Sequence, residues 1–205
     1  MNETRWASLP GARSGADYAK RFAELAASGA DVHGEAAFCA RLVEADARIL
    51  DAGCGTGRVA TRLAELGFDC VGVDADPSMV AQARSAAPDL RWIDADLAEM
   101  DGDDELTGPF DLVVAAGNVM PLLSPGSEAR VLAALAERLA PGGRLVAGFG
   151  LDAAHLPLDE APFGLAEYDR WCAVAGLDLE GRYATWSGEE FDGGGYAVSV
   201  HRRRT

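Results

Sequence analysis

The stretch from Arg48 to Asp76 constrains the fold of this chain more than any other. It reads RILDAGCGTGRVATRLAELGFDCVGVDAD: a short apolar run, an acid, three alternating glycines and apolar residues at helical spacing. Gly67 ends that helical pattern, and a second apolar run follows and closes on Asp74. The order strand, glycine loop, helix, strand and acid is typical of a nucleotide-binding βαβ unit.

The glycines at positions 53, 55 and 57 have a physical reason. A strand that turns at once into a helix needs backbone angles that a Cβ disfavours, and a ligand on the turn needs the main chain to come close. The start of the helix offers unpaired N–H groups to that ligand. Asp74, at the end of the second strand, can accept hydrogen bonds from two ribose hydroxyls.

Two residues argue against a dinucleotide. The dinucleotide fingerprint has a third glycine where this chain has Arg58. Asp51 lies directly before the loop, where a carboxylate would repel a pyrophosphate. A ligand that carries an amino group there would instead be attracted. An NAD-dependent oxidoreductase is therefore the weaker of the nucleotide-binding interpretations.

The run Leu50 to Gly57, LDAGCGTG, closely resembles the glycine motif of class I S-adenosylmethionine-dependent methyltransferases. The resemblance implies that Asp51 holds the methionine ammonium, directly or through water. It also implies that the loop packs against the methionine part and that Asp74 binds the ribose. The cofactor-binding residues expected in this unit are Asp51, Gly53, Cys54, Gly55, Thr56, Gly57, Asp74 and Ala75.

Further cofactor contacts are expected after the next two strands. A strand over Leu90–Ile93 precedes Asp96 and Leu97, which the resemblance places beside the adenine; Asp94 is the alternative to Asp96. An almost wholly apolar strand over Phe110–Ala115 precedes Gly117 and Asn118, at the rim where open α/β sheets bind ligands.

The residues after that strand bear on the acceptor. Methyltransferases that modify amino groups of nucleic-acid bases have Asn or Asp followed by two prolines and an aromatic ring. This chain has Asn-Val-Met-Pro at 118–121, which counts against base methylation.

The N-terminal part is expected to be a loose arm over 1–14 and two helices, over 17–27 and 34–44. In the resembling family such helices cap the cofactor and help to form the substrate pocket. Tyr18 and Arg21 are therefore candidate contacts of cofactor or substrate. We interpret the chain as one methyltransferase domain, with cap helices in residues 1–46 and a cofactor-binding core in residues 47–205.

The remaining patterns complete an α/β fold. Helices are expected over 77–86, 127–139 and within 161–175, and strands over 144–149, 177–186 and 196–203. The turn before 144 is Pro141-Gly142-Gly143. The resemblance implies a Rossmann-like, seven-stranded, mostly parallel sheet with helices on both faces. It would end in an antiparallel hairpin whose last strand is inserted between its neighbours.

Composition restricts the partners. The net charge is −15 and Lys20 is the only lysine, so the chain should repel nucleic acid and anionic membrane surfaces. The four cysteines form no CxxC pair, which argues against a zinc site and a disulfide framework. The acidic run at positions 101, 103, 104 and 105 is interpreted as a solvated loop, and no metal is expected. A cytoplasmic protein is the prediction, since neither a signal peptide nor a membrane-length apolar run is present.

The function hypothesis is methyl transfer from S-adenosyl-L-methionine to a small-molecule acceptor. The main requirement is alignment of the methyl group with the acceptor atom. A general base is needed only if the acceptor must lose a proton, and His33 and His155 are the candidates. The alternative from another class is a module that binds the cofactor without chemistry. The acceptor atom and the oligomeric state stay open.

Overall fold

The computed structural model describes residues 3–9, 14–100, 106 and 108–205. Its centre is one seven-stranded sheet in the order β3-β2-β1-β4-β5-β7-β6. Strands β3, β2, β1, β4 and β5 are parallel, and β7 is antiparallel to both β5 and β6. The strands are β1 (Arg48–Ala52), β2 (Asp69–Asp74), β3 (Arg91–Asp94), β4 (Phe110–Ala115), β5 (Leu139–Gly150), β6 (Leu177–Tyr183) and β7 (Tyr196–Arg203).

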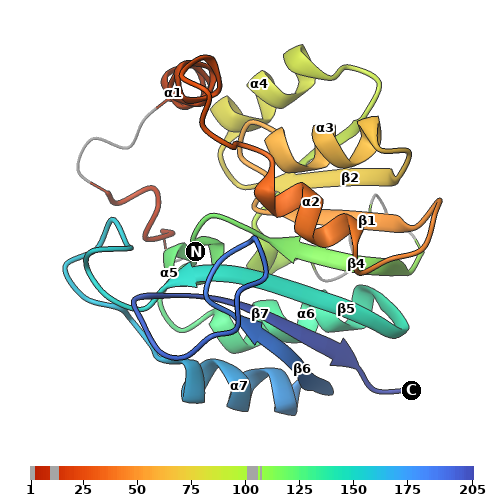
Figure 1. Ribbon diagram of the computed structural model, residues 1–205, viewed down its shortest axis with the longest axis vertical. Helices are drawn as coiled ribbons and strands as arrows, with labels where there is room; N and C mark the ends of the chain where they lie inside the picture. Colours follow the sequence, from red (N-terminus) through yellow and green to blue (C-terminus); the bar gives the residue numbers. More distant parts are fainter. Residues whose placement is uncertain (1–2, 10–13, 101–105, 107) are drawn as a thin grey trace.

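Helices cover both faces of this sheet (Figure 1). One core cluster joins the sheet to α2, α3 and α4, and the other joins it to η1, α6 and α7. The helices are α1 (Gly15–Ala27), α2 (Gly34–Ala40), α3 (Arg58–Glu65), α4 (Pro77–Ala86), η1 (Leu97–Glu99), α5 (Val119–Leu122), α6 (Glu128–Arg138) and α7 (Leu165–Val174). The predicted fold is confirmed, including the insertion of β7 between β5 and β6.

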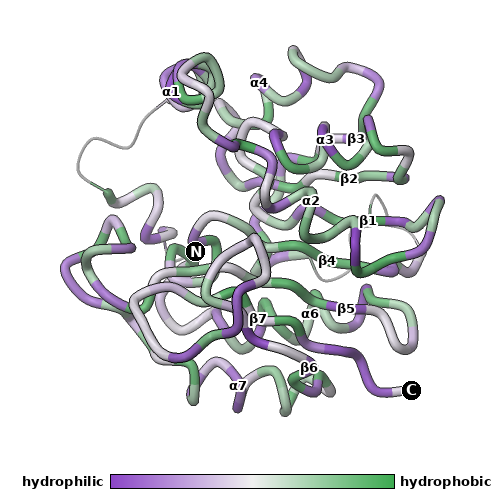
Figure 2. Tube along the Cα trace, in the orientation of Figure 1, coloured by the Kyte–Doolittle hydropathy of each residue, from purple (hydrophilic) through white to green (hydrophobic). Residues whose placement is uncertain are grey.

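Strand β4 shows why the sheet is buried on both sides. Phe110, Leu112, Val113 and Val114 have no exposed surface. Val113 packs into the core under α6 and α7, while Leu112 and Val114 face the core under α2 and α3. Apart from the exposed Asp111, β4 is apolar along its length, as a central parallel strand requires (Figure 2).

Helix α1 lies outside the layers of helices that cover the sheet and packs on α4. Gly15 makes this possible, because a Cβ there would come within 2.2 Å of the Ser78 carbonyl oxygen. The Gly15 N–H also donates to the Ser78 hydroxyl at 2.9 Å. The start of α1 is thereby held beside the carboxyl end of β2.

Two predicted boundaries differ from the structure by four residues or more. Helix α2 ends at Ala40 instead of residue 44, because tighter i→i−3 bonds form in its last turn and Arg144 of β5 binds the Leu42 carbonyl oxygen at 2.9 Å. Strand β5 begins at Leu139 instead of residue 144. The Pro-Gly-Gly sequence lies inside it as an irregularity, in which Phe110 pairs with Leu139 and Leu112 already pairs with Arg144.

The interpretation of residues 1–14 as a loose arm is wrong for the described residues 3–9. They form a turn that bonds to α5, α6 and the start of α4 through Arg5 and Trp6. The short helices η1 and α5 were also not predicted. The acidic run at 101–105 lies outside the described residues.

Within the described part of the chain, every helix is too short or too polar to cross a membrane.

Candidate functional site

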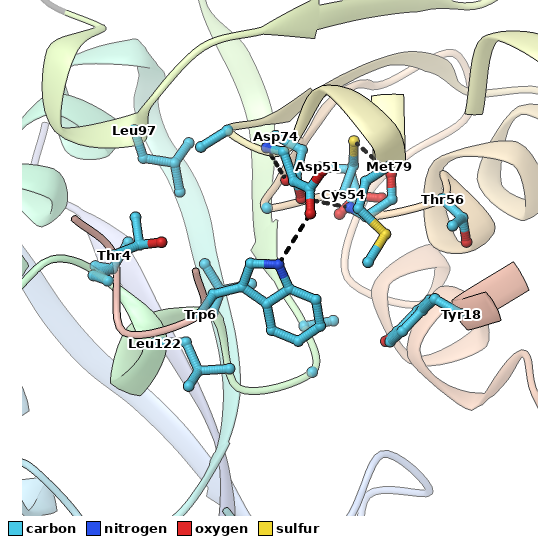
Figure 3. Close-up of a pocket in the computed structure, with 18 of the residues that line it drawn as sticks. Thr4, Trp6, Tyr18, Asp51, Cys54, Thr56, Asp74, Met79, Leu97 and Leu122 are labelled. Atoms are coloured by element: carbon cyan, nitrogen blue, oxygen red, sulfur yellow. Dashed lines mark hydrogen bonds between the residues drawn. The ribbon is translucent and has the colours of Figure 1, made fainter. Parts of the chain in front are cut away.

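A cavity of about 310 Å³ opens at the carboxyl ends of β1, β2 and β4. This is the point where the sheet order reverses, and open α/β sheets bind ligands there. Figure 3 shows side chains from both sides of the sheet end pointing into it. The residues that line the cavity include Trp6, Tyr18, Asp51, Gly55, Arg58, Asp74, Asp76, Met79, Asp96, Leu97, Val119 and Leu122.

The glycine loop is built as its sequence predicts. Gly53, Gly55 and Gly57 have φ angles of 74°, 54° and 81°, in the left-handed region. The N–H groups of Gly53 and Cys54 both donate to the Val73 carbonyl oxygen, at 2.8 and 2.9 Å. The loop is therefore fastened to β2, and the backbone at Gly55 is left facing the cavity with only Tyr18 near it, at 4.0 Å from the position of a Cβ.

Asp51 is the most buried charged group of the cavity, with 2% of its surface exposed. Its Oδ2 accepts a hydrogen bond from the Ala60 N–H in the first turn of α3, at 3.0 Å. Burial raises the pKa of Asp51 to about 7, and the Ala60 hydrogen bond and the nearby Arg58 only partly oppose this. A cationic group beside Asp51 would restore its charge, as the ammonium of an amino acid would.

Asp74 accepts two backbone hydrogen bonds. Its Oδ2 accepts from the Gly55 N–H at 2.7 Å and its Oδ1 from the Asp76 N–H at 2.9 Å. Burial raises the pKa of Asp74, while these two bonds lower it. Each carboxylate oxygen has a second lone pair, so Asp74 can still accept from a pair of ribose hydroxyls.

The structure distinguishes Asp96 from Asp94. Asp96 lines the cavity and caps η1, since its Oδ1 accepts from the Ala98 N–H at 2.8 Å. Leu97 is buried beside it and also lines the cavity. Asp94 is exposed at the end of β3 and is not among the lining residues. This placement favours Asp96 as the adenine-side acid.

Gly57 and Asn118 were predicted to contact the cofactor, but in the structure both lie in other surroundings. A Cβ on Gly57 would lie 2.4 Å from Cη2 of Trp92, so this glycine makes room for packing between α3 and the sheet. The Asn118 side chain accepts from the Gly150 N–H at 2.7 Å and donates to the His155 carbonyl oxygen at 3.1 Å. Neither residue lines the cavity, whereas the neighbouring Gly117 does.

The remaining candidates lie in α1, in the connection to α2 and in the loop after β5, and they differ in whether they line the cavity. Tyr18 lines the cavity, and burial raises the pKa of its hydroxyl. Arg21 and His33 are exposed and are not lining residues. His155 is also exposed and pairs with Asp152 at 2.7 Å. The structure brings neither histidine to the cavity.

Sequence reasoning missed Trp6, Met79 and Arg58 as lining residues. Met79 belongs to the first turns of α4, directly after the βαβ acid, so its spacing from Asp74 was a usable signal. Trp6 offered none, because nothing local relates it to the sheet.

The described residues that line the cavity are strongly acidic as a set. Four carboxylates line it, those of Asp51, Asp74, Asp76 and Asp96, against the one guanidinium of Arg58. That guanidinium binds both oxygens of Glu35 at 2.5 and 2.8 Å and lies over the Phe22 ring at 4.7 Å. A ligand of net positive charge fits this environment, and a pyrophosphate does not.

Comparison with known proteins agrees with this chemistry. The family model described as "Methyltransferase domain" matches residues 49–143. A TehB-like S-adenosylmethionine-dependent methyltransferase from Corynebacterium glutamicum is 33% identical in sequence. It superimposes with a TM-score of 0.81, over 93% of this chain and 98% of that one. The chain belongs to the class I S-adenosylmethionine-dependent methyltransferases, and S-adenosylmethionine is the cofactor of this family.

Curated relatives match over shorter stretches. The putative methyltransferase YqeM of Bacillus subtilis is 40% identical over 70 residues, which are 33% of this chain and 27% of that protein. Magnesium-protoporphyrin O-methyltransferase of Rhodobacter capsulatus is 35% identical over 91 residues, 44% of this chain and 40% of that one. The matches thus span less than half of these relatives.

Proposed function

We propose that this protein transfers the methyl group of S-adenosylmethionine to a small-molecule acceptor. The observation that carries the proposal is the cavity at the ends of β1, β2 and β4, which brings Asp51, Asp74 and Asp96 together around the glycine loop. Asp51 would bind the ammonium, Asp74 the ribose and Asp96 the adenine side. Met79, Leu97 and Val119 also line the cavity and supply apolar surface.

A small acceptor is favoured by how the cavity is enclosed. Trp6 and Tyr18 come from segments that precede the matched domain, and their rings lie 6.2 Å apart in an edge-to-face arrangement. Together with Leu122 they line the cavity from the side of the N-terminal segments and α5 (Figure 3). The relative that modifies magnesium-protoporphyrin supports a small acceptor, since its name identifies one.

The chain's own contribution to the reaction is alignment and exclusion of water. Bound S-adenosylmethionine supplies an electrophilic methyl on a sulfonium, and its charge disappears as the new bond forms. The carboxylates and the loop would fix the donor, and Tyr18, beside the open backbone of Gly55, would border the acceptor. Holding the two in place lowers the entropic part of the barrier. No described histidine lines the cavity, and the raised pKa of Tyr18 keeps its hydroxyl protonated. We therefore assign no general base.

We extend the proposal to the organisation of the chain: one domain, with residues 1–46 as cap and 47–205 as cofactor-binding core. A cytoplasmic location is part of the proposal. It is supported by four free, buried thiols, of which Cys39 and Cys172 have pKa values raised by burial.

Calorimetric titration with S-adenosylmethionine, S-adenosylhomocysteine and NAD tests the proposal. The wild type should bind both sulfur ligands and not NAD. Asp74→Ala should weaken that binding at least tenfold (~1.4 kcal/mol). Asp94→Ala is the matched control, because it removes an exposed acid from the end of the neighbouring strand and should leave the affinity unchanged.

Absence of binding of either sulfur ligand to the folded wild type would reject the proposal. Release of S-adenosylhomocysteine in the presence of any acceptor would reject the alternative of a binding module without chemistry.

A further inference from the structure

The described N-terminal residues 3–9, which we name the N-terminal strap, lie outside the segment that matches the family domain. They have a defined conformation. The Thr4 carbonyl oxygen accepts from the Ser8 N–H at 3.2 Å, the Trp6 carbonyl oxygen accepts from the Leu9 N–H at 3.2 Å, and the Thr4 hydroxyl accepts from the Ala7 N–H at 3.1 Å. The strap is therefore a folded turn.

One end of the strap is fastened beside α5 and α6. Arg5 Nη1 donates to Glu128 Oε1 at 2.8 Å and to the Leu123 carbonyl oxygen at 3.0 Å. The backbone N–H of Trp6 donates to the Leu122 carbonyl oxygen at 3.2 Å. Glu128 is only 5% exposed, so withdrawal of Arg5 would leave a buried carboxylate without this cation. The ion pair favours the seated position of the strap.

The other side of the strap reaches α4 across the cavity. Trp6 Nε1 donates to Asp76 Oδ2 at 3.2 Å, and Asp76 is the N-cap of α4, accepting at Oδ1 from the Ser78 N–H at 2.9 Å. Burial would raise the pKa of Asp76, but the hydrogen bonds from Ser78 and Trp6 hold it below its usual value. The Trp6 bond therefore goes to a charged acceptor.

The strap thus spans the cavity between two elements that the sheet holds apart. Thr4, Trp6 and Ala7 all line it. Figure 3 shows the Trp6 indole extending into the cavity toward the loop acids, between Leu122 and Tyr18. An aromatic ring in this place covers apolar ligand surface and excludes water from the carboxylates beneath it.

We propose that the strap is a working part of the donor site: Trp6 covers the bound cofactor, and the Arg5–Glu128 ion pair holds Trp6 there. The strap then determines both the affinity for the cofactor and the rate at which its demethylated product leaves. This inference rests on the proposed function, because it takes S-adenosylmethionine as the ligand of the cavity.

The test measures dissociation constants by calorimetry and release of labelled S-adenosylhomocysteine by exchange with unlabelled ligand, on the full chain. Trp6→Ala should weaken S-adenosylhomocysteine at least tenfold, and Trp6→Phe, which keeps a ring but loses the N–H, should weaken it less. Arg5→Ala should speed release at least fivefold, and Arg5→Lys should restore part of the slow release.

Arg204→Ala is the matched control. Arg204 also pairs with a carboxylate, that of Asp178 at 2.5 Å, and binds a carbonyl oxygen, that of Ala173, but none of these residues lines the cavity. Arg204→Ala should change neither the dissociation constant nor the release rate of S-adenosylhomocysteine. Thermal unfolding of each variant shows whether weak binding comes from an unfolded protein or from a folded protein that has lost the strap contacts.

Variants of Trp6 and Arg5 that fold and keep the wild-type affinity and release rate would overturn this inference while the proposed function stands. Failure of the wild type to bind S-adenosylhomocysteine would overturn the proposed function and this inference together.

Discussion

At the scale of a single residue, two influences on the protonation of Asp51 oppose each other. Burial favours the neutral acid, and a ligand cation would favour the charged carboxylate. Its pKa of about 7 lies well above the usual value of 3.8. Because the pKa of Asp51 is higher in the folded protein than in the unfolded chain, protonation of Asp51 stabilises the fold. This contribution to the free energy of unfolding is fully present below about pH 3.8 and is lost as the pH rises through about 7.

Cofactor binding should follow the opposite course with pH. If the ammonium requires charged Asp51, each pH unit below about 7 should weaken S-adenosylmethionine about tenfold. Titrations at pH 8, 7, 6 and 5.5 would measure this. Asp51→Asn should bind weakly and lack the pH step; an unchanged slope in Asp51→Asn would assign the step to another group.

A second prediction at this scale concerns Gly57. Gly57→Ala would place a Cβ 2.4 Å from Trp92 at a φ of 81°, whereas Gly67→Ala would meet no atom within 4 Å at a φ of 97°. Both variants pay backbone strain of about 1–2 kcal/mol, and only the first adds overpacking of about 1–3 kcal/mol. Urea unfolding of both should show the difference. Equal losses would mean that the Trp92 ring moves aside at no cost.

At the scale of secondary-structure elements, Arg58 connects three helices. It begins α3, binds Glu35 in α2, and its guanidinium lies over Phe22 in α1. It also donates to the Val32 carbonyl oxygen in the connection between α1 and α2. Helices α1 and α2 are therefore joined to α3, the helix that follows the glycine loop.

A double-mutant cycle on Arg58→Ala and Glu35→Ala should give a coupling free energy of about 1.5–3 kcal/mol, because the pair is bidentate and mostly buried. The two side chains are 19% and 18% exposed. The pair Arg62–Glu65 on α3, with side chains 39% and 57% exposed, is the control and should couple by less than about 1 kcal/mol. Equal couplings would show that the first pair does not join the helices.

At the scale of the whole molecule, the net charge of −15 opposes the compact state. Salt shortens the Debye length from about 30 Å at 0.01 M to about 8 Å at 0.15 M, which screens this repulsion. The melting temperature should therefore rise between these two concentrations of NaCl. A fall would mean that the surface ion pairs outweigh the repulsion, since salt weakens them as well.

The sheet and the acids of the cavity were predictable because their signals are local. The alternation of strand and helix from Arg48 onward sets a parallel sheet, and parallel strands end at one rim. Asp51, Asp74 and Asp96 each follow or end such a strand, so their convergence followed from the chain order. The family resemblance added the antiparallel hairpin, the ligand and the choice of Asp96 over Asp94.

What the tertiary structure alone decided are contacts between residues far apart in the chain. Arg5 and Glu128 are 123 positions apart, and Trp6 and Asp76 are 70 apart, so no periodicity or turn chemistry relates them. The role of Gly57 depends on Trp92 of β3, and that of Asn118 on the end of β5. The sequence determined the sheet and the acidic rim through local backbone preferences, while long-range packing decided how the cavity is covered.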